Sequence, residues 1–220
     1  MEAIILAGGM GTRLRSVCSD LPKPMAVVQG KPFLHHLMAY WKEQGVTRFI
    51  LSVGYLAEKI ISYFGKEFQA IPIEYSIEKE PLGTGGGLLH ALPLLLSLQD
   101  PFLVLNGDTL FQVPLKNFNL QGDLSLSLRL VEENHRYDGV TLAPDGQVIH
   151  LKANAPLING GVYFFHRNAL SSFETTKALS LEKEILPYFI KKGTCFGQCF
   201  DQFFIDIGIP EDYYRAQLLL

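Results

Sequence analysis

A glycine-rich loop with polar side chains spans residues 6–14, which read LAGGMGTRL. Three glycines in four positions let backbone amides approach a ligand closely, because no Cβ stands in the way. Consecutive N–H groups in such a turn form a concave site for an anion. Thr12 adds a hydroxyl donor, and Arg13 adds a forked positive charge that suits phosphate. The loop therefore predicts a phosphate-binding site.

A lysine between two prolines follows in residues 21–25, which read LPKPM. Each proline fixes its own φ and restrains the residue before it, so we expect Lys23 in extended backbone on both sides. A lysine on a stiffened loop beside an anion site is suited to bind a triphosphate. The alternative is an exposed lysine in a surface turn, which the neighbouring glycine loop disfavours.

Two carboxylates follow apolar segments that are typical of buried strands. Asp108 comes soon after residues 102–105 (FLVL), and Asp206 ends the apolar part of FFID. Mg²⁺ is usually bound by one or two carboxylates together with phosphate oxygens. Two carboxylates at two strand ends therefore suit a Mg²⁺ site. Asp201 is an alternative to Asp206 on spacing alone.

Two better-known glycine motifs do not fit the loop. The dinucleotide fingerprint G-x-G-x-x-G needs a glycine where Leu14 stands, and an acidic residue where the chain has Lys31 and Pro32. The ATPase loop G-x-x-x-x-G-K-[ST] has no match. A dinucleotide-dependent oxidoreductase is therefore disfavoured.

The elements that must position these residues alternate between strand and helix in the first half of the chain. This alternation predicts an α/β fold, a three-layer α/β/α sandwich with a Rossmann-like, mostly parallel mixed sheet, in a single domain covering residues 1–220. The second half predicts short strands that extend the sheet. We expect strands at residues 3–7, 49–53, 71–77, 102–105, 124–131, 162–165, 195–200 and 203–207, a turn at 145–146, and helices at 33–41, 57–64, 87–98, 181–192 and from 210.

The loop LAGGMGTRL followed by LPKPM resembles the signature of the sugar-1-phosphate nucleotidyltransferases, over roughly the whole chain. The resemblance implies the nucleotide-diphospho-sugar transferase type of fold, with Arg13, Lys23 and Asp108 as catalytic residues. It also implies bound Mg²⁺ on Asp108 and Asp206, because residues 206–212 (DIGIPED) match the family's motif only in that register. The nucleotide-binding residues that it implies are Leu6, Ala7, Gly8, Gly9, Gly11, Thr12, Arg13, Lys23, Glu80, Gly83, Thr84, Asn106 and Gly107.

A second glycine-rich segment, residues 80–87 (EPLGTGGG), opens a predicted helix. Its backbone can receive a flat ring or an anion at close range. The resemblance makes it the segment that recognises the base, with Glu80 and Gly83 near the nucleobase. A purely structural turn is the alternative.

The sugar phosphate is expected at Gly139, Lys152 and Asn159, which match family positions that contact it. One position departs from the family pattern. An acidic residue usually precedes the lysine, and Leu151 stands there instead. The sugar contact of that acid must be absent or supplied from elsewhere, for which Glu182 and Glu184 are the candidates.

Composition excludes several classes of partner. The formal net charge of −3 gives no basic field for a nucleic acid. The longest apolar stretch, residues 92–98, is too short to span a bilayer, and Glu2 stands where a signal peptide would carry positive charge. Cys18, Cys195 and Cys199 cannot all pair with one another and show no second ligand pair for a metal. We therefore expect a reduced, cytoplasmic setting.

The segments EPLGTGGGL and SLEKEILP resemble those of guanylyltransferases that act on D-glycero-D-manno-heptose 1-phosphate. They occur also in enzymes for mannose 1-phosphate with GTP and muramate 1-phosphate with UTP, which remain alternatives in that order. A non-catalytic nucleotide-sugar-binding regulator is the rival from another class. Exposed aromatic residues in the second half leave room for a homodimer.

Overall fold

The computed structural model describes residues 1–9, 11–14, 17, 20–96, 101–132, 134, 137–174 and 177–220, without the side chains of Thr12, Asp138, Lys152 and Ala153. A ten-stranded sheet runs through this described part of the chain. Its strands are β1 (Glu2–Leu6), β4 (Arg48–Val53), β5 (Glu67–Phe68), β6 (Ile71–Ile77), β7 (Phe102–Asn106), β9 (Leu124–Leu130), β10 (Asp138–Leu142), β11 (Val148–Ala153), β12 (Leu157–Phe165) and β13 (Cys195–Cys199).

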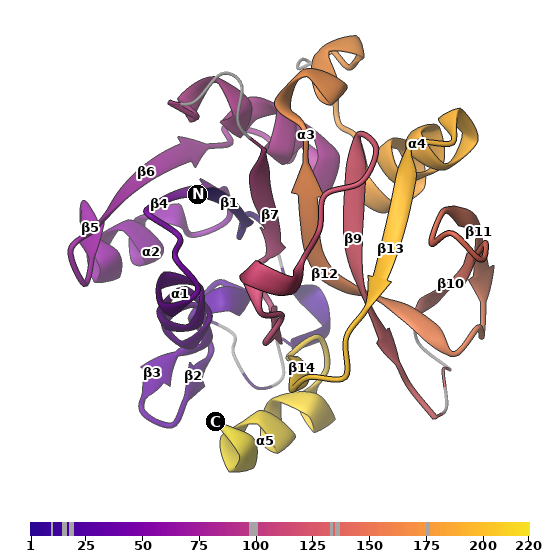
Figure 1. Cartoon of the computed structure of the whole chain (residues 1–220). Coiled ribbons are helices and arrows are strands. Elements are labelled where there is room, and N and C mark those ends of the chain that lie inside the picture. Colours follow the sequence, from indigo (N-terminus) through magenta and orange to yellow (C-terminus); the bar gives the residue numbers. More distant parts are fainter. Residues whose placement is uncertain are drawn as a thin grey trace.

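The sheet changes character along its width (Figure 1). Strands β7, β1, β4 and β6 are parallel neighbours, whereas β12 pairs antiparallel with β7, β9 and β10. Two small sheets join β2 (Val27–Val28) to β3 (Lys31–Pro32) and β8 (Thr109–Phe111) to β14 (Phe204–Asp206). This arrangement confirms the predicted mixed α/β sheet. The first half of the chain is parallel except for the short edge strand β5, which pairs antiparallel with β6, and the second half is mixed.

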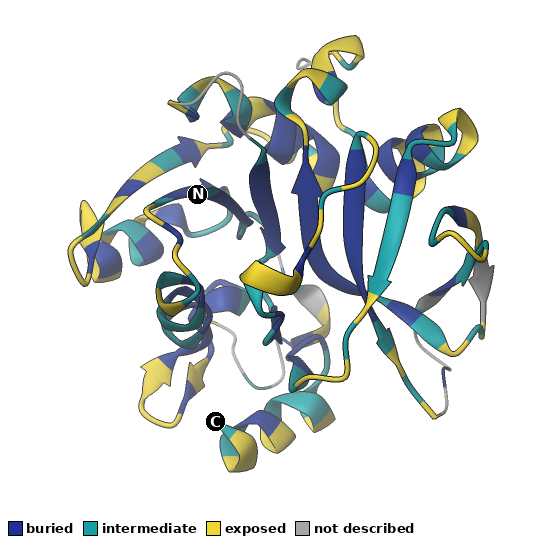
Figure 2. Ribbon diagram, in the orientation of Figure 1, coloured by how far each residue is buried: buried dark blue, intermediate teal, exposed yellow. Residues whose placement is uncertain are grey.

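Helices cover both faces of the sheet. They are α1 (Phe33–Glu43), α2 (Ala57–Phe64), α3 (Gly83–Ala91), α4 (Leu186–Lys192) and α5 (Pro210–Leu219). Successive residues of a strand point to opposite faces, so Ile5 belongs to the core beneath α1, α2 and α5, while Ile4 belongs to the core beneath α3 and α4. The central strands are therefore buried on both sides, as the dark blue ribbons in Figure 2 show. In the described ranges, no helix has the length and apolar character needed to cross a membrane.

The helix predicted for residues 87–98 is placed differently. It begins at Gly83 and ends at Ala91, and a 3₁₀ turn that contains Pro93 follows. The glycines inside α3 are required by packing. A Cβ on Gly85 would lie 2.9 Å from Ile185 Cδ1, and a Cβ on Gly86 would lie 3.0 Å from Lys177 O. Close tertiary contact therefore outweighs the low helix propensity of glycine.

The helix predicted for residues 181–192 has two parts. A π-helical turn covers Leu181–Ile185, and α4 continues from Leu186. The Ser180 hydroxyl accepts a hydrogen bond from Lys183 N and caps the turn. This turn packs against α3 and so brings its polar residues to the end of that helix.

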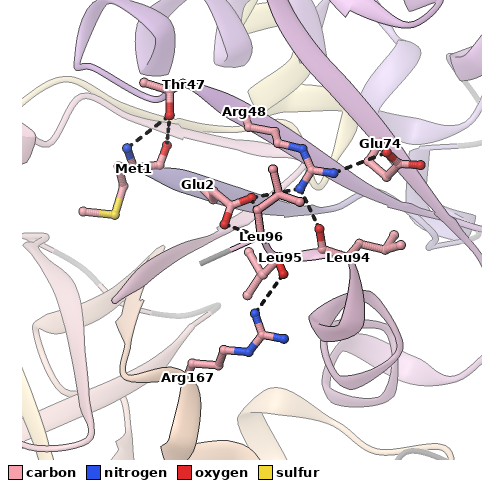
Figure 3. A network of polar contacts seen from close by, with 9 residues as sticks. All are labelled: Met1, Glu2, Thr47, Arg48, Glu74, Leu94, Leu95, Leu96 and Arg167. Atoms are coloured by element: carbon pink, nitrogen blue, oxygen red, sulfur yellow. Dashed lines mark hydrogen bonds and ion pairs between the residues drawn. The ribbon is translucent and has the colours of Figure 1, made fainter. Parts of the chain in front are cut away.

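A polar network closes the amino ends of the parallel strands, as Figure 3 shows. The Arg48 guanidinium, at the start of β4, lies 2.8 Å from Glu2 Oε1 and 3.3 Å from Glu74 Oε2. The same guanidinium donates to Leu94 O, and Arg167 donates to Leu95 O at 2.9 Å. The charged groups at the amino edge of the sheet are therefore paired within the protein, and we assign this edge a structural role.

Candidate functional site

The carboxyl edge of the same strands opens into a cavity of about 690 Å³. Four of its lining residues stand at or just beyond the ends of the parallel strands: Leu6 on β1, Ser52 on β4, Glu78 after β6 and Asn106 on β7. Open α/β sheets bind their ligands at this edge. The geometry therefore places a binding site where the glycine-rich loop was expected.

The glycine-rich loop forms one wall of the cavity through Gly8, Gly9, Gly11 and Arg13. Gly11 has a φ of +56°, and a Cβ there would lie 2.9 Å from Lys23 Cβ. The loop thus rests directly on Lys23, and only glycine permits both the conformation and the contact.

Lys23 itself is not in the extended backbone that its two prolines predicted. Pro22 is extended, with a ψ of 146°, but Lys23 begins a 3₁₀ turn that ends at Met25. Met25 N donates to Pro22 O at 2.8 Å, and Ala26 N donates to Lys23 O at 3.0 Å. Pro24 fits this turn because the first positions of a helical turn need no N–H donor.

The Lys23 ammonium forms an ion pair with Asp108 Oδ2 at the cavity wall. The two side chains are 10% and 30% exposed, so the pair is largely shielded from solvent. Burial by itself would raise the pKa of the Asp108 carboxyl, but the adjacent Lys23 ammonium holds that pKa below its ordinary value. Asp108 is therefore ionised at neutral pH.

Asp206 reaches the same place from the other end of the chain. Strand β14 pairs with β8 so that Asp206 stands opposite Thr109. The Thr109 hydroxyl lies 3.2 Å from Asp108 Oδ1 and 3.3 Å from Asp206 Oδ2, so the two carboxylates lie beside the same hydroxyl. Asp201, the alternative, is exposed and pairs with Arg129.

The chemistry of this donor set suits a hard divalent cation. Four carboxylates line the cavity, and those of Asp108 and Asp206 lie next to the same hydroxyl, but no group of three or more His, Cys, Asp or Glu side chains in the described ranges is placed to hold a metal. A Mg²⁺ ion commonly takes one or two protein carboxylates and completes its shell with phosphate and water oxygens. Asp108 and Asp206 therefore fit a cation that arrives with a phosphorylated substrate.

A bulge in β12 positions the Asn159 side chain in the cavity. Asn159 pairs with Leu128 of β9 and Tyr163 with Leu126, so four positions of β12 span two positions of β9. Gly161 takes up the bulge with a φ of +72°. Asn159 Nδ2 donates to the Tyr163 hydroxyl at 2.8 Å, and Asn159 Oδ1 accepts from Gly161 N at 3.1 Å. The Asn-Gly-Gly sequence thus fixes the orientation of Asn159.

Glu182 closes the cavity from the π-helical turn. Its Oε2 accepts hydrogen bonds from the Thr84 hydroxyl at 2.8 Å and from the Ser180 hydroxyl at 3.0 Å. Leu151 also lines the cavity, whereas Glu184 is exposed and accepts from Ser180 N. Of the two acids considered as substitutes at this position, Glu182 is therefore the one on the cavity wall.

Comparison with known proteins identifies the family. The model of the family described as "Nucleotidyl transferase" matches residues 2–220. The chain belongs to the nucleotidyl transferase family.

Two relatives and one solved structure show how far this similarity extends. D-glycero-alpha-D-manno-heptose 1-phosphate guanylyltransferase of Aneurinibacillus thermoaerophilus is 42% identical, over 99% of this chain and 97% of that protein. The enzyme of the same name from Campylobacter jejuni is also 42% identical, over 98% of each. The crystal structure of HddC from Yersinia pseudotuberculosis complexed with GMP-PN has a TM-score of 0.87 at 38% identity, over 99% of this chain and 98% of that one.

Most residues expected in the site of this nucleotidyl transferase line the cavity at the carboxyl edge of the strands. They are Leu6, Ala7, Gly8, Gly9, Gly11, Arg13, Lys23, Gly83, Thr84, Asn106, Asp108, Asn159, Glu182 and Asp206. The side chains of Thr12 and Lys152 lie outside the described part of the structure. Glu80 is exposed and does not line the cavity.

Gly107 and Gly139 are buried behind the cavity wall and do not line it. A Cβ on Gly107 would lie 2.6 Å from Leu6 O, and a Cβ on Gly139 would lie 2.5 Å from Ala155 Cβ. In this structure both glycines allow close backbone packing next to the cavity.

Several lining residues were missed from the sequence, among them Ser52, Glu78, Thr109 and Tyr163. Ser52 and Glu78 stand at the carboxyl ends of predicted strands, so the rule that identified Asp108 would have found them. Tyr163 is fully buried inside a strand, and no sequence pattern distinguishes it from a core residue.

Proposed function

We propose that the protein transfers GMP from GTP to D-glycero-α-D-manno-heptose 1-phosphate and releases pyrophosphate. One observation carries the nucleotidyl-transfer part of this proposal. Lys23, Asp108 and Asp206 meet at the cavity wall beside the glycine-rich loop. The relatives named as heptose enzymes and the GMP-PN complex of the solved neighbour support the choice of sugar and base.

The triphosphate is proposed to lie along the glycine-rich loop. Backbone amides of the loop and the Arg13 guanidinium bind its oxygens. The Lys23 ammonium is positioned by its ion pair with Asp108, and the base of the same side chain packs closely beside Gly11. Lys23 therefore loses little side-chain conformational entropy when it binds the phosphates. Its positive charge offsets the negative charge that develops on the leaving pyrophosphate.

Asp108 and Asp206 would hold Mg²⁺ together with substrate oxygens. The bound ion supplies charge neutralisation on the phosphates and favours attack at phosphorus. The Thr109 hydroxyl lies within hydrogen-bond distance of both carboxylates and can donate to either one, which favours their lying side by side.

The nucleophile needs no general base. The second pKa of a phosphate monoester is about 6, so the sugar phosphate is mostly dianionic at neutral pH. Its oxygen attacks the α-phosphorus of the nucleotide in line, the new P–O bond forms, and the bond to the β-phosphate oxygen breaks. Pyrophosphate leaves with that electron pair. We expect Lys152 to orient the attacking phosphate, as the family resemblance implies.

The sugar is proposed to lie beside Leu151, Asn159 and Glu182, which we call the sugar side of the cavity. Asn159 is held by the bulge in β12, and Glu182 is held by Thr84 and Ser180. A carboxylate accepts hydrogen bonds from sugar hydroxyls. Glu182 thereby takes the role of the acid that Leu151 replaces.

Pyrophosphate release tests the proposal. The protein is assayed with Mg²⁺ against ATP, CTP, GTP and UTP, each combined with heptose, mannose or muramate 1-phosphate. We expect the highest kcat/KM with GTP and D-glycero-α-D-manno-heptose 1-phosphate. A higher value with mannose 1-phosphate, or with UTP and muramate 1-phosphate, would reassign the substrate. Tight binding of a nucleotide sugar without turnover in any combination would favour a non-catalytic regulator.

A further inference from the structure

A second cavity, of about 450 Å³, lies at the other end of the strands. Strand β12 runs between the two cavities: Asn159 lines the first, at the carboxyl edge, and His166, directly after β12, lines the second. The end of β12 lies at the amino end of β7, because Phe165 stands opposite Phe102. No described residue lines both cavities. The second cavity is therefore a separate space, to which the proposed function gives no role.

Basic side chains outnumber acidic ones in the lining of the second cavity. Arg167 and Lys192 carry permanent charges and His166 carries an imidazole, whereas Asp123 is the one carboxylate among the described lining residues. Lys192 Nζ donates to Asp123 Oδ2 at 2.7 Å, and this hydrogen bond lowers the pKa of the Asp123 carboxyl below its ordinary value. An ammonium has three N–H donors, so Lys192 can bind a second anion beside Asp123. The balance of charge in the lining favours an anionic ligand.

Neutral polar groups form most of the remaining wall. The Ser171 hydroxyl donates to Asn168 O at 2.9 Å, and the Ser172 hydroxyl lies 3.3 Å from the Tyr188 hydroxyl. Each hydroxyl can donate one hydrogen bond and accept two, so these groups keep bonding capacity for a ligand. Among the described lining residues, Ala169 alone has a side chain without polar atoms. This wall suits a ligand rich in hydroxyl groups, because it offers little apolar surface to a nucleobase or an acyl chain.

Contacts between distant segments hold the basic residues in place. His166 N donates to Asp123 O at 3.1 Å, which joins the end of β12 to the start of β9. The Lys192–Asp123 ion pair ties α4 to the same point. The Arg167 guanidinium donates to Leu95 O at 2.9 Å and so joins the structural network of Figure 3. The walls of the second cavity are thus formed without a ligand, which lowers the entropic cost of binding one.

We propose that the second cavity binds a sugar phosphate. The side chains of His166, Arg167 and Lys192 hold the phosphate through charge-assisted hydrogen bonds. The hydroxyls of the two serines and of Tyr188 bind the sugar. The volume of about 450 Å³ lies within the usual range for small-molecule sites, about 300–1,000 Å³. This inference is independent of the proposed function, because the two cavities share no described lining residue.

An NMR titration of the whole ¹⁵N-labelled protein tests the proposal with glucose 6-phosphate as the probe. Amide shifts report both where the probe binds and how tightly. We expect saturable shifts at residues 166–172 and at Lys192, with a Kd in the millimolar range or below. Free glucose and inorganic phosphate are titrated separately, and each should bind about tenfold more weakly because each makes only part of the contacts.

Two variants that break the same ion pair distinguish an anion site from a structural contact. Lys192→Ala removes a phosphate donor, so the Kd for glucose 6-phosphate should rise by about tenfold. Asp123→Asn removes a negative charge beside the phosphate, so the Kd should fall by roughly three- to tenfold. Lys191→Ala is the matched control, because Lys191 is the exposed neighbour of Lys192 and does not line the cavity. It should keep the Kd of the wild type. Circular dichroism shows whether each variant is folded.

Several outcomes would overturn the inference. The first is the absence of saturable shifts at residues 166–172 at millimolar probe, or shifts confined to the glycine-rich loop of the first cavity. Weaker binding by both Lys192→Ala and Asp123→Asn would assign the ion pair a purely structural role. An equal loss in Lys191→Ala would show attraction to general surface charge only. Inorganic phosphate that binds as tightly as glucose 6-phosphate would exclude a site for the sugar. Pyrophosphate release by the wild type tests the proposed function separately, whichever of these results is obtained.

Discussion

The proposed nucleotide side of the cavity, at the glycine-rich loop and the ends of the parallel strands, is built differently from the proposed sugar side. On the nucleotide side, Leu6, Ser52 and Glu78 stand at the ends of parallel strands, and glycines bring the adjoining loops into close contact. On the sugar side, Asn159 depends on a bulge and Glu182 on a π-helical turn. Backbone connectivity places the first set, whereas contacts between distant segments place the second. Substitutions should therefore have larger and more general effects on the nucleotide side.

Loss of the Lys23 ammonium is the largest expected effect. Lys23→Ala removes the charge that offsets the leaving pyrophosphate, so kcat should fall by about a thousandfold, the upper range for one stabilising donor. The ellipticity and the cooperative melt should remain. Steady-state kinetics of pyrophosphate release measure the effect, with the exposed Lys31→Ala as control. Normal turnover by Lys23→Ala would remove this residue from the mechanism.

The second largest effect is expected at the carboxylates proposed to bind Mg²⁺. Asp206→Asn removes one of two anionic oxygen donors, so the Mg²⁺ concentration for half-maximal rate should rise by roughly 10- to 100-fold. Titration of the rate with Mg²⁺ measures this shift. Asp201→Asn is the matched control, because Asp201 is exposed and pairs with Arg129 away from the cavity. The assignment is wrong if Asp201→Asn shifts the Mg²⁺ titration and Asp206→Asn does not.

Alanine substitutions at Gly11 and at Gly30 distinguish the effect of backbone strain from the effect of the contact with Lys23. Both have positive φ, at +56° and +76°, but a Cβ would meet Lys23 only at Gly11. Alanine in this conformation costs about 1–2 kcal/mol, so Gly30→Ala should lose about this much stability in chemical denaturation, and Gly11→Ala should lose more because its Cβ also meets Lys23. Only Gly11→Ala should also lower kcat/KM, by roughly tenfold or more, because Lys23 is displaced. Equal kcat/KM for the two variants would show that the contact does not position Lys23.

The smallest effect is expected on the sugar side. Glu182→Gln weakens hydrogen bonds to the sugar, so the KM for the sugar phosphate should rise by about tenfold while the KM for GTP stays constant. Glu184→Gln, two positions away and exposed, is the control. Initial rates at varied concentrations of each substrate distinguish the two constants. A change in the KM for GTP alone would place Glu182 on the nucleotide side instead.

The amino-acid sequence predicted much of this protein. Alternating apolar segments indicated the parallel strands, and α2 begins and ends where its pattern predicted, at Ala57 and Phe64. The spacing of the glycines, Lys23 and the aspartates by itself indicated phosphate and metal chemistry. The predicted strands, and the predicted glycines and aspartates that line the cavity, are found because they depend on local rules: strand periodicity, the small size of glycine, and the position of residues at strand ends. The metal site stays a prediction.

Only the tertiary structure decided which side chains meet. Lys23 lies in a 3₁₀ turn against Gly11, although its prolines favoured extended backbone. The consecutive glycines of α3, residues 85–87, lie in a helix despite their low helix propensity, and neighbouring segments leave no room for a Cβ there. Glu78 enters the cavity while Glu80 does not, and Glu182 reaches Thr84 from 98 positions away. Such contacts join segments far apart in the chain, and their geometry depends on how the whole core packs, which no local pattern encodes.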